Sequence, residues 1–205
     1  MNESTSTPEL ELAGIIPFSP SDWPGHLVAT AFTQGCPLRC CYCHNPSLLP
    51  IQPGKVAFGE LLSLLDERRG LLDGAVISGG EPLIQPGLPQ AIAALHARGF
   101  LVGLHTSGYS AQRFRRLFAC PETTPDWVGL DIKALPRDFD AVSPGRPRAA
   151  TESLSCLRLL VDAHVECQIR TTIWPGSVLE EHLPELKELV ASFGQSLHVQ
   201  QVIDR

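Results

Sequence analysis

Three cysteines near residue 40 are spaced so that their thiolates can bind one metal cluster. Cys36, Cys40 and Cys43 are separated by three and then by two residues, within the segment Thr-Gln-Gly-Cys-Pro-Leu-Arg-Cys-Cys-Tyr-Cys-His-Asn-Pro at 33–46. A loop of this length can bring three thiolates around one [4Fe–4S] cubane. An electron-carrying cubane usually takes four cysteine ligands, so three ligands leave one iron free to bind another molecule. The spacing therefore predicts a cluster with an open coordination site.

A structural zinc ion is the main alternative for the same cysteines. Zinc takes four ligands, and Cys41 or His44 could complete the set. Each of these residues is next to a proposed ligand in the chain, however, and no second ligand pair follows at zinc-finger distance. We therefore interpret Cys41 as a bystander. The isolated Cys120, Cys156 and Cys167 are interpreted as small buried residues or surface thiols.

Two further segments have the residue types to hold a polar, charged ligand. Residues 78–82 are Ser-Gly-Gly-Glu-Pro, and paired glycines allow a ligand to approach the backbone closely. Asp131 and Lys133 end a predicted strand, whose two-residue period places both on one face. Opposite charges facing a sheet interior pair with each other or with a charged ligand, because an isolated buried charge is costly. The alternatives are a tight turn for the glycines and a solvated ion pair for the charges.

Two other predicted strands add candidates for the same site. Arg170 occupies an alternating position of its strand, from which its two-pronged guanidinium can bind a carboxylate. An exposed arginine at the strand edge is the alternative. Residues 105–108, His-Thr-Ser-Gly, end another strand, so Thr106 can line the pocket. The alternative for this segment is a serine that caps the next helix.

Strand-like and helix-like segments alternate from residue 27 onward and place these candidates at strand ends. Predicted strands cover 27–33, 75–78, 100–105, 127–132, 165–173 and 197–202, and predicted helices cover 60–68, 90–98, 111–118, 152–163 and 180–193. Such β/α units predict an α/β fold with a parallel sheet, whose C-terminal strand ends usually carry the active site. Periodicity leaves open whether the sheet is doubly wound or a curved partial barrel. Residues 136–148 are the longest predicted loop.

Length and composition predict a folded soluble protein. The chain has 205 residues, of which 43% are hydrophobic and 19% charged. Residues 1–13 are predicted to be a flexible N-terminal tail and 14–205 a single domain. The net charge of −6 argues against nucleic-acid binding. No apolar run is long enough to span a bilayer and no secretory signal is present, so we expect no membrane partner and a cytoplasmic location.

The cysteine motif, with aromatic Tyr42 before its third cysteine, resembles the signature of the radical S-adenosylmethionine (SAM) superfamily. The longer pattern is similar to the activating enzymes of glycyl-radical enzymes, and most to those of anaerobic ribonucleoside-triphosphate reductase. The segments that carry this similarity are 18–19 (Phe-Ser), 22–25 (Asp-Trp-Pro-Gly), 32–36 (Phe-Thr-Gln-Gly-Cys) and 43–46 (Cys-His-Asn-Pro). The resemblance covers nearly the whole chain after residue 13.

The resemblance implies a radical SAM core, which is a partial (β/α)6 TIM-type barrel with parallel strands, and two cofactors, a [4Fe–4S] cluster and SAM. One electron from the cluster would cleave SAM to methionine and a 5′-deoxyadenosyl radical, which would take a hydrogen atom from a glycine of a partner enzyme. The cofactors carry this chemistry, so no catalytic side chain is expected. The implied metal ligands are Cys36, Cys40 and Cys43, and the implied cofactor-binding residues are Tyr42, His44, Gly79, Gly80, Glu81, Thr106, Asp131, Lys133 and Arg170.

The resemblance also implies partners. The radical acceptor is expected to be anaerobic ribonucleotide reductase, and the electron donor flavodoxin or ferredoxin, because the chain has no ferredoxin-like cysteine insertion. In some activating enzymes an aspartate at the position of His105 helps to bind a monovalent cation; histidine is a poor ligand for such an ion, so we predict no cation site. Two alternatives remain open, a radical SAM enzyme acting on a small molecule, similar to 7-carboxy-7-deazaguanine synthase, and a non-enzymatic metal-binding module.

Overall fold

The computed structural model describes residues 10–202, which form a seven-stranded sheet with its strands in chain order from β1 to β7. The first two strands pair antiparallel, and every later pair of neighbours is parallel. The strands are β1 (Leu12–Ser19), β2 (Val28–Thr33), β3 (Gly74–Gly79), β4 (Leu101–Thr106), β5 (Trp127–Asp131), β6 (Glu166–Ile173) and β7 (Leu197–Gln201).

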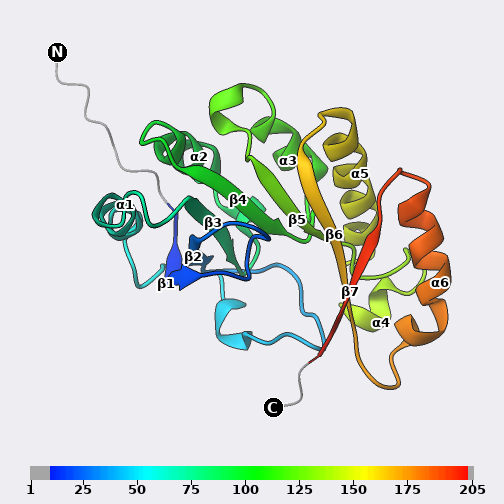
Figure 1. The fold of residues 1–205 in the computed structure, drawn as a ribbon. Coiled ribbons are helices and arrows are strands. Elements are labelled where there is room, and N and C mark those ends of the chain that lie inside the picture. Colours follow the sequence, from blue (N-terminus) through cyan, green and yellow to red (C-terminus); the bar gives the residue numbers. More distant parts are fainter. Residues whose placement is uncertain (1–9, 203–205) are drawn as a thin grey trace.

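The helices lie on one side of this curved sheet (Figure 1). They are α1 (Phe58–Glu67), α2 (Leu88–His96), α3 (Ala111–Leu117), α4 (Phe139–Val142), α5 (Arg148–Asp162) and α6 (Val178–Ala191), with short 3-10 turns η1 (Pro46–Leu48), η2 (Pro82–Ile84) and η3 (Pro121–Thr123). In parallel sheets each crossover is right-handed, so strands that follow one another in chain order keep their helices on one face. This order decides the question that periodicity left open. The sheet is a partial barrel, and not a doubly wound sheet.

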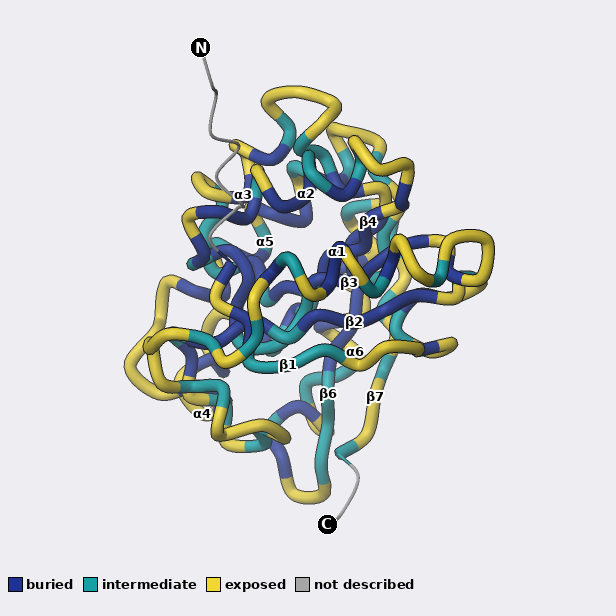
Figure 2. The backbone as a smooth tube through the Cα atoms, turned by 90° about the vertical axis from the view of Figure 1, so that its left-hand side faces the viewer, coloured by how far each residue is buried: buried dark blue, intermediate teal, exposed yellow. Residues whose placement is uncertain are grey.

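The main core fills the space between the helices and the outer face of the sheet. Helix α1 illustrates why the chain folds this way, since its buried residues recur with the period of an amphipathic helix. They are Phe58, Leu61, Leu62 and Leu65. In β2 the alternate residues Ala29 and Ala31 are fully buried in the same core, and Figure 2 shows the central strands as the most buried part of the backbone. The opposite face of the strands is thereby left to line the barrel interior.

The connection between β1 and β2 closes the N-terminal end of that interior. Trp23 is 2% exposed and stacks on Trp127 of β5 with ring centroids 5.6 Å apart. Val28 and Val76 complete this small apolar cluster. Large aromatic side chains bury much apolar area, so this cluster closes the barrel interior below its polar part.

The structure corrects the sequence prediction at the N-terminal side. Strand β1 was not predicted, because its exposed residues and Pro17 break the alternation expected of a strand. Of the predicted tail, residues 1–9 lie outside the described residues, whereas Leu10 and Leu12 are buried in the core. Residues 10–13 therefore belong to the fold. Within the predicted loop at 136–148 the chain forms the short helix α4.

None of the helices in the described part of the chain is both long and apolar enough to cross a bilayer.

Candidate functional site

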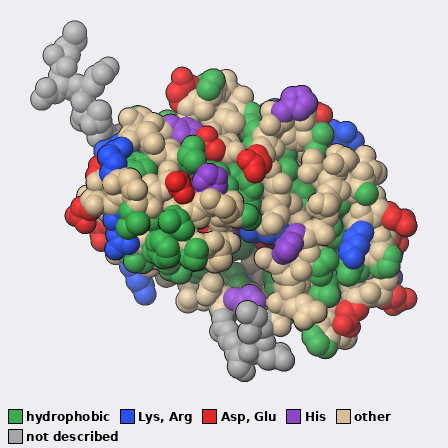
Figure 3. All heavy atoms as spheres, in the orientation of Figure 1, with side chains coloured by type: hydrophobic (Ala, Val, Ile, Leu, Met, Phe, Trp, Pro, Cys, Tyr) green, Lys and Arg blue, Asp and Glu red, His purple; other side chains and the backbone are tan. Residues whose placement is uncertain are grey.

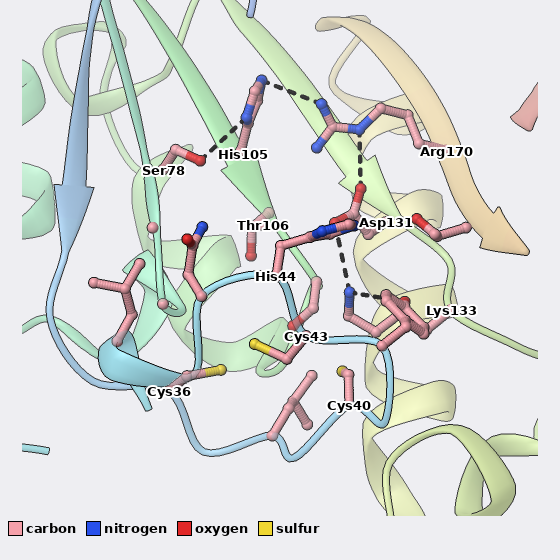
Figure 4. A pocket seen from close by; sticks show the side chains of 18 of the residues that line it. Cys36, Cys40, Cys43, His44, Ser78, His105, Thr106, Asp131, Lys133 and Arg170 are labelled. Carbon is pink, nitrogen blue, oxygen red and sulfur yellow. Dashed lines mark hydrogen bonds and ion pairs between the residues drawn. The ribbon is translucent and has the colours of Figure 1, made fainter. Parts of the chain in front are cut away.

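A cavity of about 350 Å³ opens at the C-terminal ends of the strands. One wall is the cysteine loop, which we define as residues 34–45 between β2 and η1, and the others are the ends of β3, β4, β5 and β6 (Figure 4). All but one of the site residues predicted from the sequence line this cavity. They are Cys36, Cys40, Tyr42, Cys43, His44, Gly79, Gly80, Thr106, Asp131, Lys133 and Arg170. The exception is Glu81.

Backbone hydrogen bonds fix the cysteine loop against the rest of the barrel. Gly35 adopts φ +96, a conformation that favours glycine, and its amide donates to the Leu48 carbonyl at 2.9 Å. The amide of Cys36 donates to the carbonyl of Leu49 at 3.1 Å. Inside the loop, the Cys43 amide donates to the Cys40 carbonyl at 3.0 Å. The spacing between the cysteines is therefore built into a turn with its own hydrogen bonds.

The three predicted ligands differ from Cys41 in their surroundings. Cys36, Cys40 and Cys43 are partly buried and face the cavity, whereas Cys41 is exposed and does not line it. Burial raises the pKa of Cys36 to about 12 and also raises the pKa of Cys40. Such thiols ionise when positively charged iron offsets the cost of burying the thiolate.

The donor set fits a cubane cluster better than a single ion. Among residues 10–202, no three His, Cys, Asp or Glu side chains are grouped closely enough to hold one metal ion. A structural zinc site needs four such ligands at about 2.0–2.3 Å from the metal. Three thiols spread along one wall of a cavity, with polar groups on the other walls, instead match a larger cluster with one open corner.

The polar walls carry a partly buried ion-pair network. Asp131 accepts a hydrogen bond at 2.9 Å from Nε of Arg170 through one carboxylate oxygen, and its other oxygen lies 3.5 Å from Nζ of Lys133. Burial alone would raise the pKa of Asp131, but Arg170 and Lys133 together outweigh it and hold this pKa below its usual value. Two cations and one carboxylate leave the network with a net charge of +1, which suits a ligand that carries a carboxylate.

Tyr42 connects this network to the cysteine loop. Its hydroxyl oxygen lies 3.4 Å from Nζ of Lys133, and its ring contacts Trp174 with centroids 5.1 Å apart. Burial raises the pKa of Tyr42 to about 12, so the phenol stays neutral. Beside the third cysteine, the ring of Tyr42 therefore forms an aromatic part of the cavity wall, and the contact with Lys133 fixes its hydroxyl.

His105 takes a neutral form whose tautomer follows from its contacts. Nε2 lies 2.7 Å from the carbonyl oxygen of Asp22, and a carbonyl only accepts, so Nε2 carries the hydrogen. The contact of Nε2 with Nη1 of Arg170 at 3.2 Å is then not a hydrogen bond, because a guanidinium only donates. Nδ1 then accepts from the Ser78 hydroxyl at 3.2 Å. Burial, together with the adjacent charge of Arg170, lowers the pKa of His105 to about 4. The histidine thus positions neighbouring groups without adding charge.

Glu81 was predicted to contact the cofactor, but its side chain lies behind the cavity wall. It is 1% exposed, and its carboxylate accepts from the amides of Leu83 and Ser107 at 3.0 and 2.9 Å. The hydroxyl of Thr106 donates to it at 2.5 Å, and the hydroxyl of Ser107 donates to it as well. With both oxygens in use, Glu81 holds the end of β4 in place and leaves Thr106 facing the cavity.

The two glycines before Glu81 bring the end of β3 against the cysteine loop. A Cβ on Gly80 would lie 2.1 Å from the carbonyl oxygen of Gly35. Gly79 has φ +105, and its Cβ would lie 2.3 Å from the amide nitrogen of Thr33. The sequence argument gave ligand approach as the reason for these glycines, and the structure adds the approach of two backbone segments.

Sequence reasoning missed several residues that line the cavity, namely Asp22, Ser78, His105, Ser107, Thr172 and Gln200. Asp22 was part of the matched segment at 22–25, and His105 of the strand-end motif, so their positions carried a signal. Ser78 likewise began the segment 78–82 that was singled out for ligand binding, whereas Gln200 gave no signal, because a single polar residue at a strand end is common. On the side between β1 and β7, the surface is hollowed and hydrophobic side chains gather over β1 and β2 (Figure 3).

Residues 30–190 match the Radical SAM superfamily. The chain therefore belongs to this superfamily, whose members use a [4Fe–4S] cluster and SAM. Among curated relatives, pyruvate formate-lyase-activating enzymes of Staphylococcus aureus, for example of strains USA300 and COL, are 35% identical over 182 residues, covering 83% of this chain and 71% of the relative. Within the superfamily, the chain is of the type that activates glycyl-radical enzymes.

Solved structures agree with this fold at low sequence identity. TYW1 with a lysine-pyruvate adduct matches with a TM-score of 0.66 at 16% identity, over 86% of this chain and 65% of that one. Streptococcus suis SuiB bound to SAM matches with a TM-score of 0.64 at 14% identity, over 84% of this chain and 39% of that one. The chain thus spans less than two thirds of each of these proteins. The likeness confirms the predicted partial barrel, and the relatives confirm an enzyme over a non-enzymatic metal-binding module.

Proposed function

We propose that Cys36, Cys40 and Cys43 bind the [4Fe–4S] cluster through which this enzyme cleaves SAM. The observation that carries this proposal is that three partly buried thiols of one loop face a cavity whose opposite wall has a net charge of +1. When bound, the cluster and SAM together supply a 5′-deoxyadenosyl radical. Everything else in the site serves to hold these two groups in a fixed relation.

The polar residues divide the tasks of holding SAM. Arg170 and Lys133 offer donors to its carboxylate, because Asp131 uses only part of their hydrogen-bonding capacity. The backbone at Gly79 and Gly80 is accessible from the cavity and suits the amino group. Tyr42, His44 and Thr106 line the remaining wall, where the nucleoside part would lie. Glu81 supports this wall from behind.

The partner is a glycyl-radical enzyme, and its identity is the finer part of the proposal. Anaerobic ribonucleotide reductase is favoured by the sequence segments at 18–25, 32–36 and 43–46 that resemble its activating enzymes. Pyruvate formate-lyase is a second candidate, because the activating enzymes of that name are 35% identical to this chain. We propose the reductase as the acceptor and flavodoxin or ferredoxin as the electron donor.

Electron paramagnetic resonance can test both parts. The protein is reconstituted with iron and sulfide without oxygen, reduced with dithionite, and mixed with SAM and one glycyl-radical enzyme at a time. We expect 5′-deoxyadenosine in each mixture and a doublet glycyl signal with the reductase. A signal with pyruvate formate-lyase alone would replace the reductase by the second candidate. Absence of SAM cleavage in protein with a complete cluster would refute the proposed site.

A further inference from the structure

Three arginines lie in or near the cysteine loop, two of them in the lining of one groove, and we call them the arginine patch. Arg39 lies in the loop itself, Arg146 lies on the segment that joins α4 to α5, and Arg148 is the first residue of α5. All three are exposed, and none of them takes part in an ion pair found within residues 10–202. This concentration of positive charge stands out because the whole chain has a net charge of −6.

Direct contacts join the patch to the loop that carries the cysteines. Nε of Arg146 donates to the carbonyl of Pro37 at 3.0 Å, between the first and second cysteine. The amide of Arg39 donates to the hydroxyl of Ser143 at 3.0 Å, on the same segment as Arg146. Arg39 is also adjacent to Cys40 in the chain. A protein that docks on the patch therefore lies beside the proposed cluster, with only the cysteine loop between them.

Stability does not account for the position of Arg148. It is the first residue of α5, and the first turn of this helix contains no acidic residue. The N-terminus of a helix carries partial positive charge, so an arginine there is mildly unfavourable and an acidic residue is the usual choice. A negatively charged partner would remove this repulsion.

Two carboxylates lie near the patch, and both are used by the backbone. Asp140 accepts from the amide of Gly145 at 2.9 Å, and Glu152 accepts from the amide of Ala111 at 2.7 Å. They stabilise the loops, and among the ion pairs of residues 10–202 neither of them pairs with an arginine of the patch. With three guanidinium groups against two carboxylates, the surface keeps a net positive charge.

A groove of about 510 Å³ gives this surface its shape. Arg146 and Arg148 line it together with Tyr109, Gln112 and the acidic Glu152. The lining combines two cations and one carboxylate with an aromatic ring and an amide, so charged and apolar surface lie side by side, as they do in protein–protein interfaces. The groove therefore offers a docking surface with charged edges.

We propose that the arginine patch docks a small acidic protein that delivers single electrons to the cluster. The inference rests on the proposed function, because it requires the cluster at Cys36, Cys40 and Cys43. In each encounter the carrier is oxidised by one electron and the cluster is reduced by one, and no atom is transferred. Opposite charges on the two surfaces steer the carrier to the loop, which raises the rate of association most at low ionic strength.

The test compares two double variants with the same change of charge. Arg146→Glu/Arg148→Glu reverses the patch, and Arg115→Glu/Arg116→Glu reverses two exposed arginines of α3 as the control. A purified flavodoxin and a purified ferredoxin are titrated onto each reconstituted protein by calorimetry. Stopped-flow absorbance then follows reduction of the cluster by the reduced carrier, and by dithionite in parallel.

We expect the patch variant to bind one of the carriers at least ~10-fold more weakly at low salt and to be reduced by it correspondingly more slowly. The difference should shrink at high salt, and reduction by dithionite should remain unchanged. The control variant should behave as the wild type. Arg148→Glu alone, which removes no hydrogen bond to the cysteine loop, should show a smaller loss in the same direction.

Equal carrier affinity in the two double variants would overturn the proposal. So would normal reduction by both carriers combined with loss of the glycyl signal, since the patch would then dock the radical acceptor. A loss of dithionite reduction in the double variant would indicate a disturbed cysteine loop. In that case Arg148→Glu alone decides, because it keeps the hydrogen bond to the loop and weakens carrier binding only if the patch docks the carrier. If wild-type protein binds and accepts electrons but never cleaves SAM, the proposed function fails while the docking surface stands.

Discussion

Replacement of Glu81 by glutamine distinguishes a supporting role of this residue from direct contact with SAM. The carboxylate accepts a backbone amide on each oxygen, from Leu83 on one and from Ser107 on the other. A glutamine has one oxygen and one amino group. In either orientation of the side-chain amide, its NH2 group therefore faces one of these two backbone N–H groups, and neither can accept. The Glu81→Gln variant therefore cannot regain the native pattern by rotating its side chain.

The magnitude follows from the number of hydrogen bonds lost. Each oxygen of Glu81 accepts from one amide and one hydroxyl, so either orientation loses two acceptor contacts at a side chain that is 1% exposed. A hydroxyl can turn to accept from the new amino group, but a backbone amide cannot. With about 1 kcal/mol for each lost bond and a further ~1–3 kcal/mol for the unsatisfied buried donor, we expect a loss of about 3 kcal/mol in the free energy of unfolding. For a chain of 205 residues this lowers Tm by about 6–12 °C.

Thermal and denaturant unfolding of the reconstituted protein measure this loss, with Glu60→Gln as the matched control. Glu60 is exposed and accepts only the amide of Ala57 at 3.0 Å, a contact that glutamine can keep, so its variant should stay within about 0.5 kcal/mol of the wild type. SAM affinity of the folded Glu81→Gln protein should fall less than tenfold. A variant that keeps full stability but no longer binds SAM would refute the reasoning, because Glu81 would then contact the cofactor directly.

Three further predictions concern the cysteines, the glycines and pH. Alanine at any one of the three cavity cysteines should abolish SAM cleavage and lower the iron content, whereas Cys41→Ala should retain both; equal loss at Cys41 would mean that the ligands are wrongly assigned. Gly80→Ala should cost about 1–3 kcal/mol in chemical denaturation, because its Cβ meets the Gly35 carbonyl, while Gly59→Ala, which meets open space, should gain up to about 1 kcal/mol. In the folded protein the pKa of His105 is lowered from 6.5 to about 4, so folding favours the neutral imidazole. The contribution of His105 to the free energy of unfolding, about 3 kcal/mol, is therefore complete above pH 6.5 and is lost as pH falls toward 4. Unfolding measured across this range should have a shallower pH dependence in His105→Asn, and parallel curves for the two proteins would contradict the assignment.

The sequence was sufficient for the repeating part of the fold. Each of the strands from β2 to β7 was predicted to within a few residues, since buried parallel strands are short apolar runs and their helices are amphipathic. Strand β1 escaped because it is an edge strand with Ile16 and Phe18 exposed, at 45% and 44%, so it lacks a buried face with regular alternation. Periodicity alone left the curvature of the sheet open, since it depends on strand order and not on the pattern within any strand; the partial barrel was predicted from the resemblance to the radical SAM superfamily, and it is confirmed.

The site divides along a similar line. Residues at strand ends, such as Asp131 and Arg170, were predicted correctly to share a cavity wall, because alternation fixes the face of a strand and parallel strands end together. Local patterns do not reveal how far a side chain reaches from the backbone. Glu81 follows two glycines that line the cavity, yet its side chain turns away from it into the structure. Only the hydrogen bonds with the end of β4 show this.

The position of the cysteine loop relative to the polar wall is set mainly by backbone atoms. The amide of Gly80 donates to the Thr33 carbonyl at 2.9 Å, and the amide of Glu81 donates to the Gly35 carbonyl at 3.0 Å. These bonds tie the end of β3 to the start of the cysteine loop, and the missing side chains of the glycines allow the close approach. Because the proposed cluster and SAM must keep a fixed distance for electron transfer, a backbone connection is well suited to hold it. Side-chain substitutions elsewhere in the cavity should therefore lower the affinity for SAM and leave the distance between the cluster and SAM unchanged.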